Sequence, residues 1–163
     1  MNVSVLSRRD AVRYCHQPHP FPSVMISISD PCMVYETAPF FSPSNRVLDI
    51  LRLSFADADG VGSRVWVPQD ASFGHGRMAV ESDLMTAEDA TRIAAFLHLH
   101  QNRDVIVHCD AGLSRSAGVA AAIMKHFNGD DSPVFDSGKY YPNMWCYRLT
   151  LEALEKRNAY ENV

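Results

Sequence analysis

The sequence predicts an α/β fold in which a central, mostly parallel sheet of about four to five strands is flanked by helices. Two observations support this prediction. Short apolar runs rich in β-branched residues alternate along the chain with segments of helical periodicity, and no internal repeat or low-complexity tract interrupts them. The length of 163 residues is enough to bury one core, so we expect a single domain over residues 1–163.

The strand predictions rest on short apolar segments that end at turn or helix signals. The four segments are VSVL at Val3–Leu6, SVMISIS at Ser23–Ser29, RVLDILRLSF at Arg46–Phe55 and DVIVH at Asp104–His108. The second is bounded by Asp30-Pro31, a pair that breaks regular structure. The last is uniformly apolar until His108, as expected for a buried strand.

The helix predictions rest on caps and on periodic apolar positions. Ser7 can cap a weak helix after the first strand, and Thr86 with Asp89 comes close to a capping box. A third helix, from Ser114 to about Phe127, is apolar nearly all round and is therefore expected to be central. A last helix begins near Pro142-Asn143. Between them, residues 56–83 hold four glycines and no sustained period, which predicts a Gly-rich excursion and not a second domain.

Composition excludes several classes of function. Charged residues make up 21% of the chain, the net charge is -4, and no basic cluster exceeds Arg8-Arg9. We therefore expect neither nucleic acid nor a membrane as the main partner, because both require a basic surface. No signal-peptide pattern precedes the first strand, so a cytoplasmic location is the default expectation. The cysteines lack a C-x-x-C pair and are expected to be free thiols: Cys15, Cys32, Cys109 and Cys146.

The stretch VIVHCDAGLSRSAG carries the strongest chemical signal. Cys109 ends a strand, Arg115 begins a helix, and Gly112 between them allows the backbone of a tight loop. Positive charge and the free N–H groups of a helix N-terminus both favour a thiolate. The amides of residues 110–115 can converge on an anion, and an arginine fork can bind two oxygens of a tetrahedral oxyanion. These features predict a phosphate-binding loop with a nucleophilic cysteine.

The segment HCDAGLSRS, His108 to Ser116, resembles the H-C-x5-R-S/T signature of the protein tyrosine phosphatase superfamily. The late position of the cysteine is similar to the dual-specificity branch, and the wider pattern is similar to small bacterial and phage phosphatases. The resemblance implies a dual-specificity-phosphatase-like fold, and it implies no metal or other cofactor. It implies that Cys109 attacks phosphorus to form a phosphocysteine and that Ser116 helps the thiolate leave. It also implies that phosphate is bound by Arg115 and by the other loop residues, Asp110, Ala111, Gly112, Leu113 and Ser114.

The family also uses an aspartate as general acid, on a loop that follows an earlier strand. Here Asp57 is the preferred candidate because it lies two residues beyond Phe55, at the end of a predicted strand. Asp59 is the alternative, and Asp70 and Asp83 are further options within the excursion. About 50 residues separate Asp57 from Cys109, more than compact relatives use. Asn143 is expected to cap the last helix, with a role in ordering the loop left open.

The substrate expectation follows from the loop, which contains no lysine and has an acidic residue at Asp110. An acidic loop disfavours substrates with several phosphates. We therefore expect a phosphorylated protein substrate, carrying phosphotyrosine and possibly phosphoserine or phosphothreonine. Two alternatives remain at this stage: a catalytically impaired phospho-binding module, and a rhodanese-like or arsenate-reductase-like cysteine enzyme. Cys32 is a candidate partner for reversible oxidation of Cys109.

Overall fold

A computed structural model describes residues 1–17, 21–31, 46–65 and 76–161. Within these residues the main sheet has four strands in the order β1 (Val3–Ser7), β6 (Asp104–Cys109), β2 (Ser23–Ser29) and β3 (Val47–Ser54). All three neighbouring pairs are parallel. The predicted α/β class with a mostly parallel sheet is confirmed.

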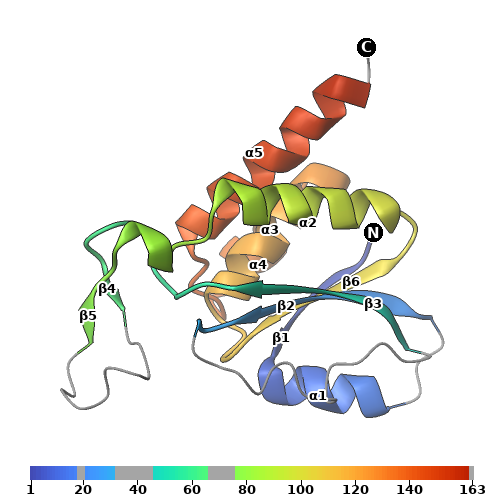
Figure 1. The fold of residues 1–163 in the computed structure, drawn as a ribbon. Helices are drawn as coiled ribbons and strands as arrows, with labels where there is room; N and C mark the ends of the chain where they lie inside the picture. The colour runs from blue at the N-terminus through green and yellow to red at the C-terminus, as the bar shows by residue number, and fades with distance from the viewer. Residues whose placement is uncertain (18–20, 32–45, 66–75, 162–163) are drawn as a thin grey trace.

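Helices cover both faces of this sheet, as Figure 1 shows. α1 (Arg8–His16) packs against β1 and β6 on one face. α2 (Ala87–Leu99) and α3 (Arg115–Asn128) cover the opposite face, and α5 (Met144–Glu161) packs on both of them as an outer layer. The short α4 (Ser132–Phe135) joins α3 to the segment before α5. β1 therefore lies within the sheet, and α5 lies outside the helices that cover it, so both ends of the described chain are part of one layered fold.

The sheet separates two hydrophobic cores, one on each face, and the side chains of β2 alternate between them. Val24, Ile26 and Ile28 are fully buried in the large core beneath α2 and α3. Met25 points to the other face, where it packs with Ala11 of α1 and with Ile106. A strand with both faces covered is apolar without a polar side, which explains why SVMISIS contains no charge.

The excursion at residues 56–83 has more structure than the sequence predicted. Its described part contains a short antiparallel pair, β4 (Arg64–Val65) and β5 (Arg77–Met78), and a 3-10 turn at Glu81–Asp83. The pair lies beside the main sheet in Figure 1. A small core of its own stabilises it, made by residues with short or medium apolar side chains: Ala56, Ala58, Val65, Ala79 and Leu84. Asp70 lies outside the described residues.

The helix boundaries agree with the capping signals. Ser7 accepts a hydrogen bond from the Asp10 amide, and Thr86 forms the predicted capping box with Asp89. α3 begins at Arg115, one residue after the predicted start, because Ser114 has a non-helical backbone. In the described part of the chain, no helix has the length and apolar character needed to cross a membrane.

Candidate active site

The carboxyl ends of the four parallel strands meet at one edge of the sheet, and each delivers polar groups there. The chain continues from β1 into Arg8, from β6 into Asp110, from β2 into Asp30 and from β3 towards Asp57. Cys109 is the last residue of β6, in the middle of this edge. Ligands of open α/β sheets bind beyond the carboxyl ends of the strands, so the topology alone makes this edge the candidate site.

The loop from Asp110 to Ser114 is tightly folded against the first strand. Gly112 has a φ of +72°, and a Cβ added there would lie 2.6 Å from backbone atoms of Leu6 and Ser7. The carbonyls of Asp110, Leu113 and Ser114 accept backbone hydrogen bonds, at 2.9 to 3.1 Å. Among the described residues, by contrast, the amides of residues 111–114 have no protein acceptor. Unpaired amides in a fixed loop favour the binding of an anion.

Cys109 lies beneath this loop. Its side chain is buried, and its Sγ is 3.1 Å from the Oγ of Ser116, in the first turn of α3. The first turn of α3, which directly follows the loop, therefore lies next to the sulfur. A hydroxyl and a helix N-terminus both stabilise negative charge on sulfur.

Arg115 is buried, with 4% of its surface exposed, and its guanidinium is used unequally. Nη1 donates to Asp30 Oδ1 at 2.9 Å and to the Phe55 carbonyl at 2.8 Å. Nη2 lies 3.4 Å from Asp110 Oδ2. Nε is buried and has no hydrogen-bond partner. The edge formed by Nε and Nη2 thus retains donors that an oxyanion can accept, while the Nη1 end is fixed by protein groups.

The charges around Arg115 shift each other's protonation. Burial acts to lower the pKa of the Arg115 guanidinium, but Asp30, Cys109, Asp57 and Asp110 together raise it. Burial and a hydrogen bond with Asp110 raise the pKa of Asp30 to about 6. Burial also acts to raise the pKa of Asp110, yet its hydrogen bond with Asp30 and the charges of Arg8 and Arg115 lower it. Arg8 forms an ion pair with Asp110, so the acidic loop residue is compensated.

Asp57 is connected to the loop by direct hydrogen bonds. Its Oδ1 accepts from Ser114 Oγ at 2.7 Å and from Asn143 Nδ2 at 3.0 Å. The same Asn143 amide donates to the Ala58 carbonyl at 3.1 Å, and its Oδ1 accepts from the Cys146 amide at 2.9 Å. Asn143 therefore caps α5, as predicted, and also joins the Asp57 loop to the start of that helix.

The other aspartates proposed as acid candidates have different surroundings. Asp59 Oδ1 accepts from the Met144 amide at 3.1 Å, which makes it a second cap for α5. Asp83 forms a bidentate ion pair with Arg77, at 2.6 and 2.7 Å, and this hydrogen bonding lowers its pKa. Of the acid candidates within the described residues, Asp57 is the one hydrogen-bonded to the loop that follows Cys109.

His108, which precedes Cys109, is a fully buried histidine with both ring nitrogens engaged. Nε2 lies 2.8 Å from Ser27 Oγ, and Nδ1 lies 3.3 Å from the Cys109 carbonyl. Burial lowers its pKa to about 4, so the ring is neutral at physiological pH. Its contacts join β6 to β2 directly below the loop.

The remaining cysteines bear on the expected thiol chemistry. Cys15, Cys109 and Cys146 are free. Cys146, in the first turn of α5, is buried, and that burial raises the pKa of its thiol. Cys32, the candidate partner for oxidation, lies outside the described residues.

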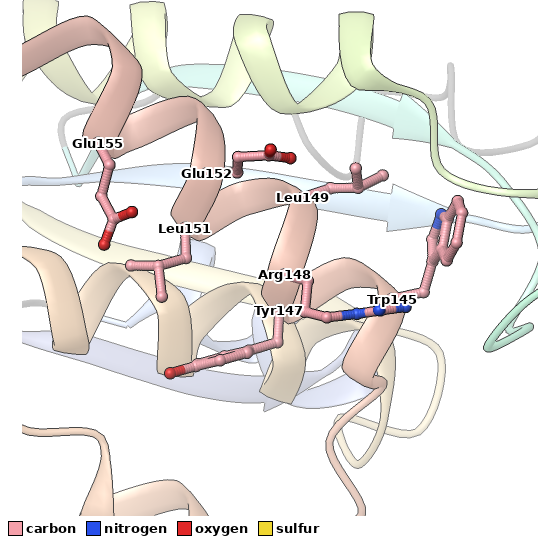
Figure 2. Close-up of a pocket in the computed structure, with 7 residues that line it drawn as sticks. All are labelled: Trp145, Tyr147, Arg148, Leu149, Leu151, Glu152 and Glu155. Atoms are coloured by element: carbon pink, nitrogen blue, oxygen red, sulfur yellow. The ribbon is translucent and has the colours of Figure 1, made fainter. Parts of the chain in front are cut away.

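A separate groove runs along the exposed side of α5, with a volume of about 420 Å³. Figure 2 shows the side chains that line it, all from this one helix and including Arg148, Glu152 and Glu155. None of these residues belongs to the loop that holds Cys109. The groove therefore contains none of the residues that the sequence predicted for catalysis or phosphate binding.

Two residues of the edge were missed by sequence reasoning. Asp30 was interpreted only as part of a strand-breaking pair, and Arg8 only as part of a small basic cluster. Both follow directly after parallel strands. That position was the available signal, because the ends of parallel strands share one edge of a sheet.

The fold places a buried cysteine and a buried arginine at the two ends of a tight loop, at the carboxyl edge of a parallel sheet. Comparison with solved structures finds similar folds. PTPMT1 in complex with PI(5)P matches with a TM-score of 0.52 and 16% identity over 98% of this chain and 94% of that one. Cydia pomonella PTP-2 phosphatase matches with a TM-score of 0.55 and 16% identity, covering 93% and 85% of the two chains.

Human DUSP28 matches with a TM-score of 0.51 and 13% identity, over 97% of this chain and 94% of that one. No protein-family model matches the sequence, and no curated protein matches it at a significant level. The chain therefore has the fold of the protein tyrosine phosphatase superfamily, in its dual-specificity-like form, as the loop signature predicted. At these identities the likeness concerns the fold.

Proposed function

We propose that residues 1–163 form one phosphatase domain that hydrolyses phosphotyrosine in proteins through a phosphocysteine intermediate, with phosphoserine and phosphothreonine as further substrates. The observation that carries the proposal is the free edge of Arg115. Its Nε is buried without a hydrogen-bond partner, whereas buried polar groups of folded proteins ordinarily have one. A phosphoryl group bound above Cys109 would supply the missing acceptors for Nε and the unpaired loop amides, and a further acceptor for Nη2 beside Asp110.

In the proposed first step the Cys109 thiolate attacks phosphorus. A P–S bond forms while the P–O bond to the leaving group breaks, and the leaving oxygen takes a proton from Asp57. Oδ1 of Asp57 accepts both of its hydrogen bonds, from Ser114 and Asn143, which leaves Oδ2 available for that proton. Arg115 and the amides of residues 111–114 bind the equatorial oxygens as their charge is redistributed.

In the second step a water molecule attacks the phosphocysteine. Asp57, now ionised, takes a proton from the water, the P–S bond breaks, and phosphate and the thiolate are released. The Ser116 hydroxyl, 3.1 Å from Sγ, stabilises the departing thiolate by donating a hydrogen bond to it. The hydrogen bonds and burial of these residues suit the roles given to them, which supports the assignment of Cys109, Arg115, Asp57 and Ser116.

The substrate class is supported by the charges of the loop. No lysine is present between Cys109 and Arg115 to bind additional phosphates, and Asp110 lies at the loop entrance. The groups left free by the protein suit one phosphoryl group. The PTPMT1 structure described above contains PI(5)P, so this lipid is the informative comparison substrate.

The test is phosphate release from an aryl phosphate, then from phosphotyrosine, phosphoserine and phosphothreonine peptides and from PI(5)P. Wild type should release phosphate from the aryl ester and prefer the phosphotyrosine peptide, and Cys109→Ser should release none. Cys15→Ser is the matched control, because Cys15 is a free thiol in α1, outside the loop. After rapid acid quenching, mass spectrometry should find phosphate on the peptide that contains Cys109.

Other outcomes distinguish the alternatives. If wild type releases no phosphate but binds phosphopeptides, the chain is a phospho-binding module and the enzyme proposal fails. Thiosulfate consumption would identify a rhodanese-like enzyme, and arsenate-dependent thiol oxidation would identify an arsenate reductase. A preference for PI(5)P over every peptide would overturn the protein substrate while leaving the phosphatase chemistry intact.

A further inference from the structure

The charged groups around Arg115 are unusually numerous for one binding arginine. Asp30 and Asp110 both contact its guanidinium, and Asp57 adds a third carboxylate in its field. The compensating cation is Arg8, which pairs with Asp110. A dianion entering this site adds further negative charge next to two carboxyl groups that already interact with each other.

The contacts of Asp30 separate it from the other carboxylates. Its side chain is 13% exposed, and its Oδ1 accepts from Arg115 Nη1, on the side of the guanidinium away from the free Nε. Together with the hydrogen bond from Nη1 to the Phe55 carbonyl, this bond fixes the orientation of the Arg115 guanidinium. Asp30 therefore determines which edge of Arg115 faces the loop, without contacting the oxyanion position itself.

Asp30 and Asp110 contact the two terminal nitrogens of the same guanidinium, so their carboxyl groups lie close together, and a proton on one of them would relieve their repulsion. Asp30 is the carboxyl that would take this proton, because burial and the neighbouring Asp110 raise its pKa to about 6, whereas the pKa of Asp110 is lowered. Near neutral pH the pair holds this proton for only part of the time. Added negative charge at Arg115 favours the protonated pair.

Building on the proposed function, we propose that Asp30 is a positioning residue for Arg115, and that the Asp30–Asp110 pair takes up one proton from solvent when a tetrahedral dianion binds. Binding of the dianion should then strengthen as the pH falls. The affinity should change by up to tenfold per pH unit in the range above the pKa of Asp30, about 6, until the pair is protonated in both states.

Other groups face the same arginine and have to be separated from Asp30. Cys109, Asp57 and Asp110 are the charges that act on Arg115 besides Asp30. Protonation of Cys109 or Asp57 would also favour a dianion. His108 has a pKa of about 4, below the range of interest. The experiment therefore uses a Cys109→Ser parent, in which the thiol is absent, and a second variant that removes the charge of Asp57.

The probe is sulfate, which remains a dianion over this whole pH range, so that any pH dependence belongs to the protein. Its binding is measured by titration calorimetry between pH 5 and pH 8, in buffers of different ionisation enthalpy that report proton uptake. The variants, each in the Cys109→Ser background, are Asp30→Asn, Asp30→Ala and Asp57→Asn, with exposed Asp136→Asn as the matched control.

The parent, the Asp57 variant and the Asp136 control should take up as much as about three-quarters of a proton per sulfate near pH 6.5, because a group with a pKa of about 6 already holds the rest. Asp30→Asn should take up almost none and bind sulfate with a flat pH profile, at least as tightly as the parent at pH 7.5, because the amide oxygen still accepts from Nη1. Asp30→Ala should have the same flat profile but bind about tenfold more weakly, since it loses that acceptor.

An unchanged proton uptake in Asp30→Asn would overturn the proton-linked part of the inference. Equal sulfate affinities of Asp30→Ala and Asp30→Asn would overturn the positioning part. Both results leave the phosphatase proposal standing if wild type hydrolyses aryl phosphate. Absence of sulfate binding by the parent would overturn the inference together with the proposed oxyanion site.

Discussion

Gly118 is the point at which the fold and the candidate site are most tightly coupled. It lies in the second turn of α3, where a Cβ would be 2.3 Å from the carbonyl oxygen of Asn143 and 3.2 Å from its carbon. That is about 1 Å too short for an ordinary contact. Gly118→Ala should therefore push the start of α5 away from α3.

The magnitude follows from two opposing effects. Alanine gains about 1 kcal/mol of helix propensity over glycine. Forcing extra volume into a packed contact costs about 1–3 kcal/mol, and the cost should lie at the upper end here because the atom displaced is backbone. Asn143 cannot move alone, since its amide donates to the Ser114 carbonyl and its carbonyl accepts from Tyr147. A net loss of about 1–2 kcal/mol in the free energy of unfolding is expected.

Turnover should fall as well as stability, because the displaced Asn143 also donates a hydrogen bond to Asp57 through Nδ2. A shift of about 1 Å at a catalytic group costs on the order of tenfold to a hundredfold in turnover. Thermal unfolding followed by circular dichroism should show a Tm lower by roughly 2–8 °C. Aryl phosphate hydrolysis, measured below the unfolding range, should show the lower kcat.

Gly60→Ala is the matched control, since an added Cβ there has no atom within 4 Å. It should leave Tm and kcat unchanged or raise Tm slightly, because alanine reduces the freedom of the unfolded chain. If Gly118→Ala has the Tm and turnover of wild type, the tight contact between α3 and Asn143 does not exist and the reasoning is refuted.

Three further outcomes are expected. Asp57→Asn should lower aryl phosphate turnover on the order of a hundredfold and remove the loss of rate at high pH, because a general acid acts only when protonated; if Asp59→Asn alone does this, the assignment of the acid is wrong. Ser116→Ala should slow phosphocysteine hydrolysis about tenfold, so that the intermediate accumulates after a burst, whereas a single slow phase without accumulation would count against its role. His108, with a pKa near 4 when folded against 6.5 as its ordinary value, binds more protons when unfolded, so its contribution of up to about 3 kcal/mol is lost as the pH falls from 6.5 to 4. The raised pKa of Asp30 has the opposite effect, because it makes the folded protein more stable as the pH falls over the same range. The free energy of unfolding, measured in urea, should therefore fall more steeply with decreasing pH in Asp30→Asn than in wild type. Equal slopes would contradict the raised pKa of Asp30.

The sequence was most informative where one short segment contains several constraints together. The loop from Cys109 to Ser116 combines a strand end, a glycine with positive φ, an arginine and a helix start, and all of them occur in the structure. Asp57 was also identifiable, because it directly follows an apolar strand. These predictions depend only on neighbours in sequence, which local patterns describe well.

Asp30 could not be assigned in the same way because its partners are distant in sequence. It lies 85 residues from Arg115 and reaches it only because β2 is the neighbour of β6. Apolar strands of similar length do not reveal their order in a sheet, since each is compatible with several neighbours. The structure of the excursion was missed for a related reason: its two-residue strands and alanine-rich core leave almost no periodic signal.

The strand order explains why the carboxyl groups converge on one arginine. β6 is flanked by β1 and β2, and β3 follows β2, so the strand ends present Arg8, then Cys109 with Asp110, then Asp30, then Asp57. Arg115 enters between them from α3 and pairs with Asp30, which follows β2, and with Asp110, which follows β6. In the proposed proton linkage, the negative charge of an incoming dianion is offset by a proton that the Asp30–Asp110 pair takes up. Phosphate binding would then depend on pH through the protein itself, and the position of Asp30 between the proposed nucleophile and the proposed acid makes it the residue through which that link can be tested.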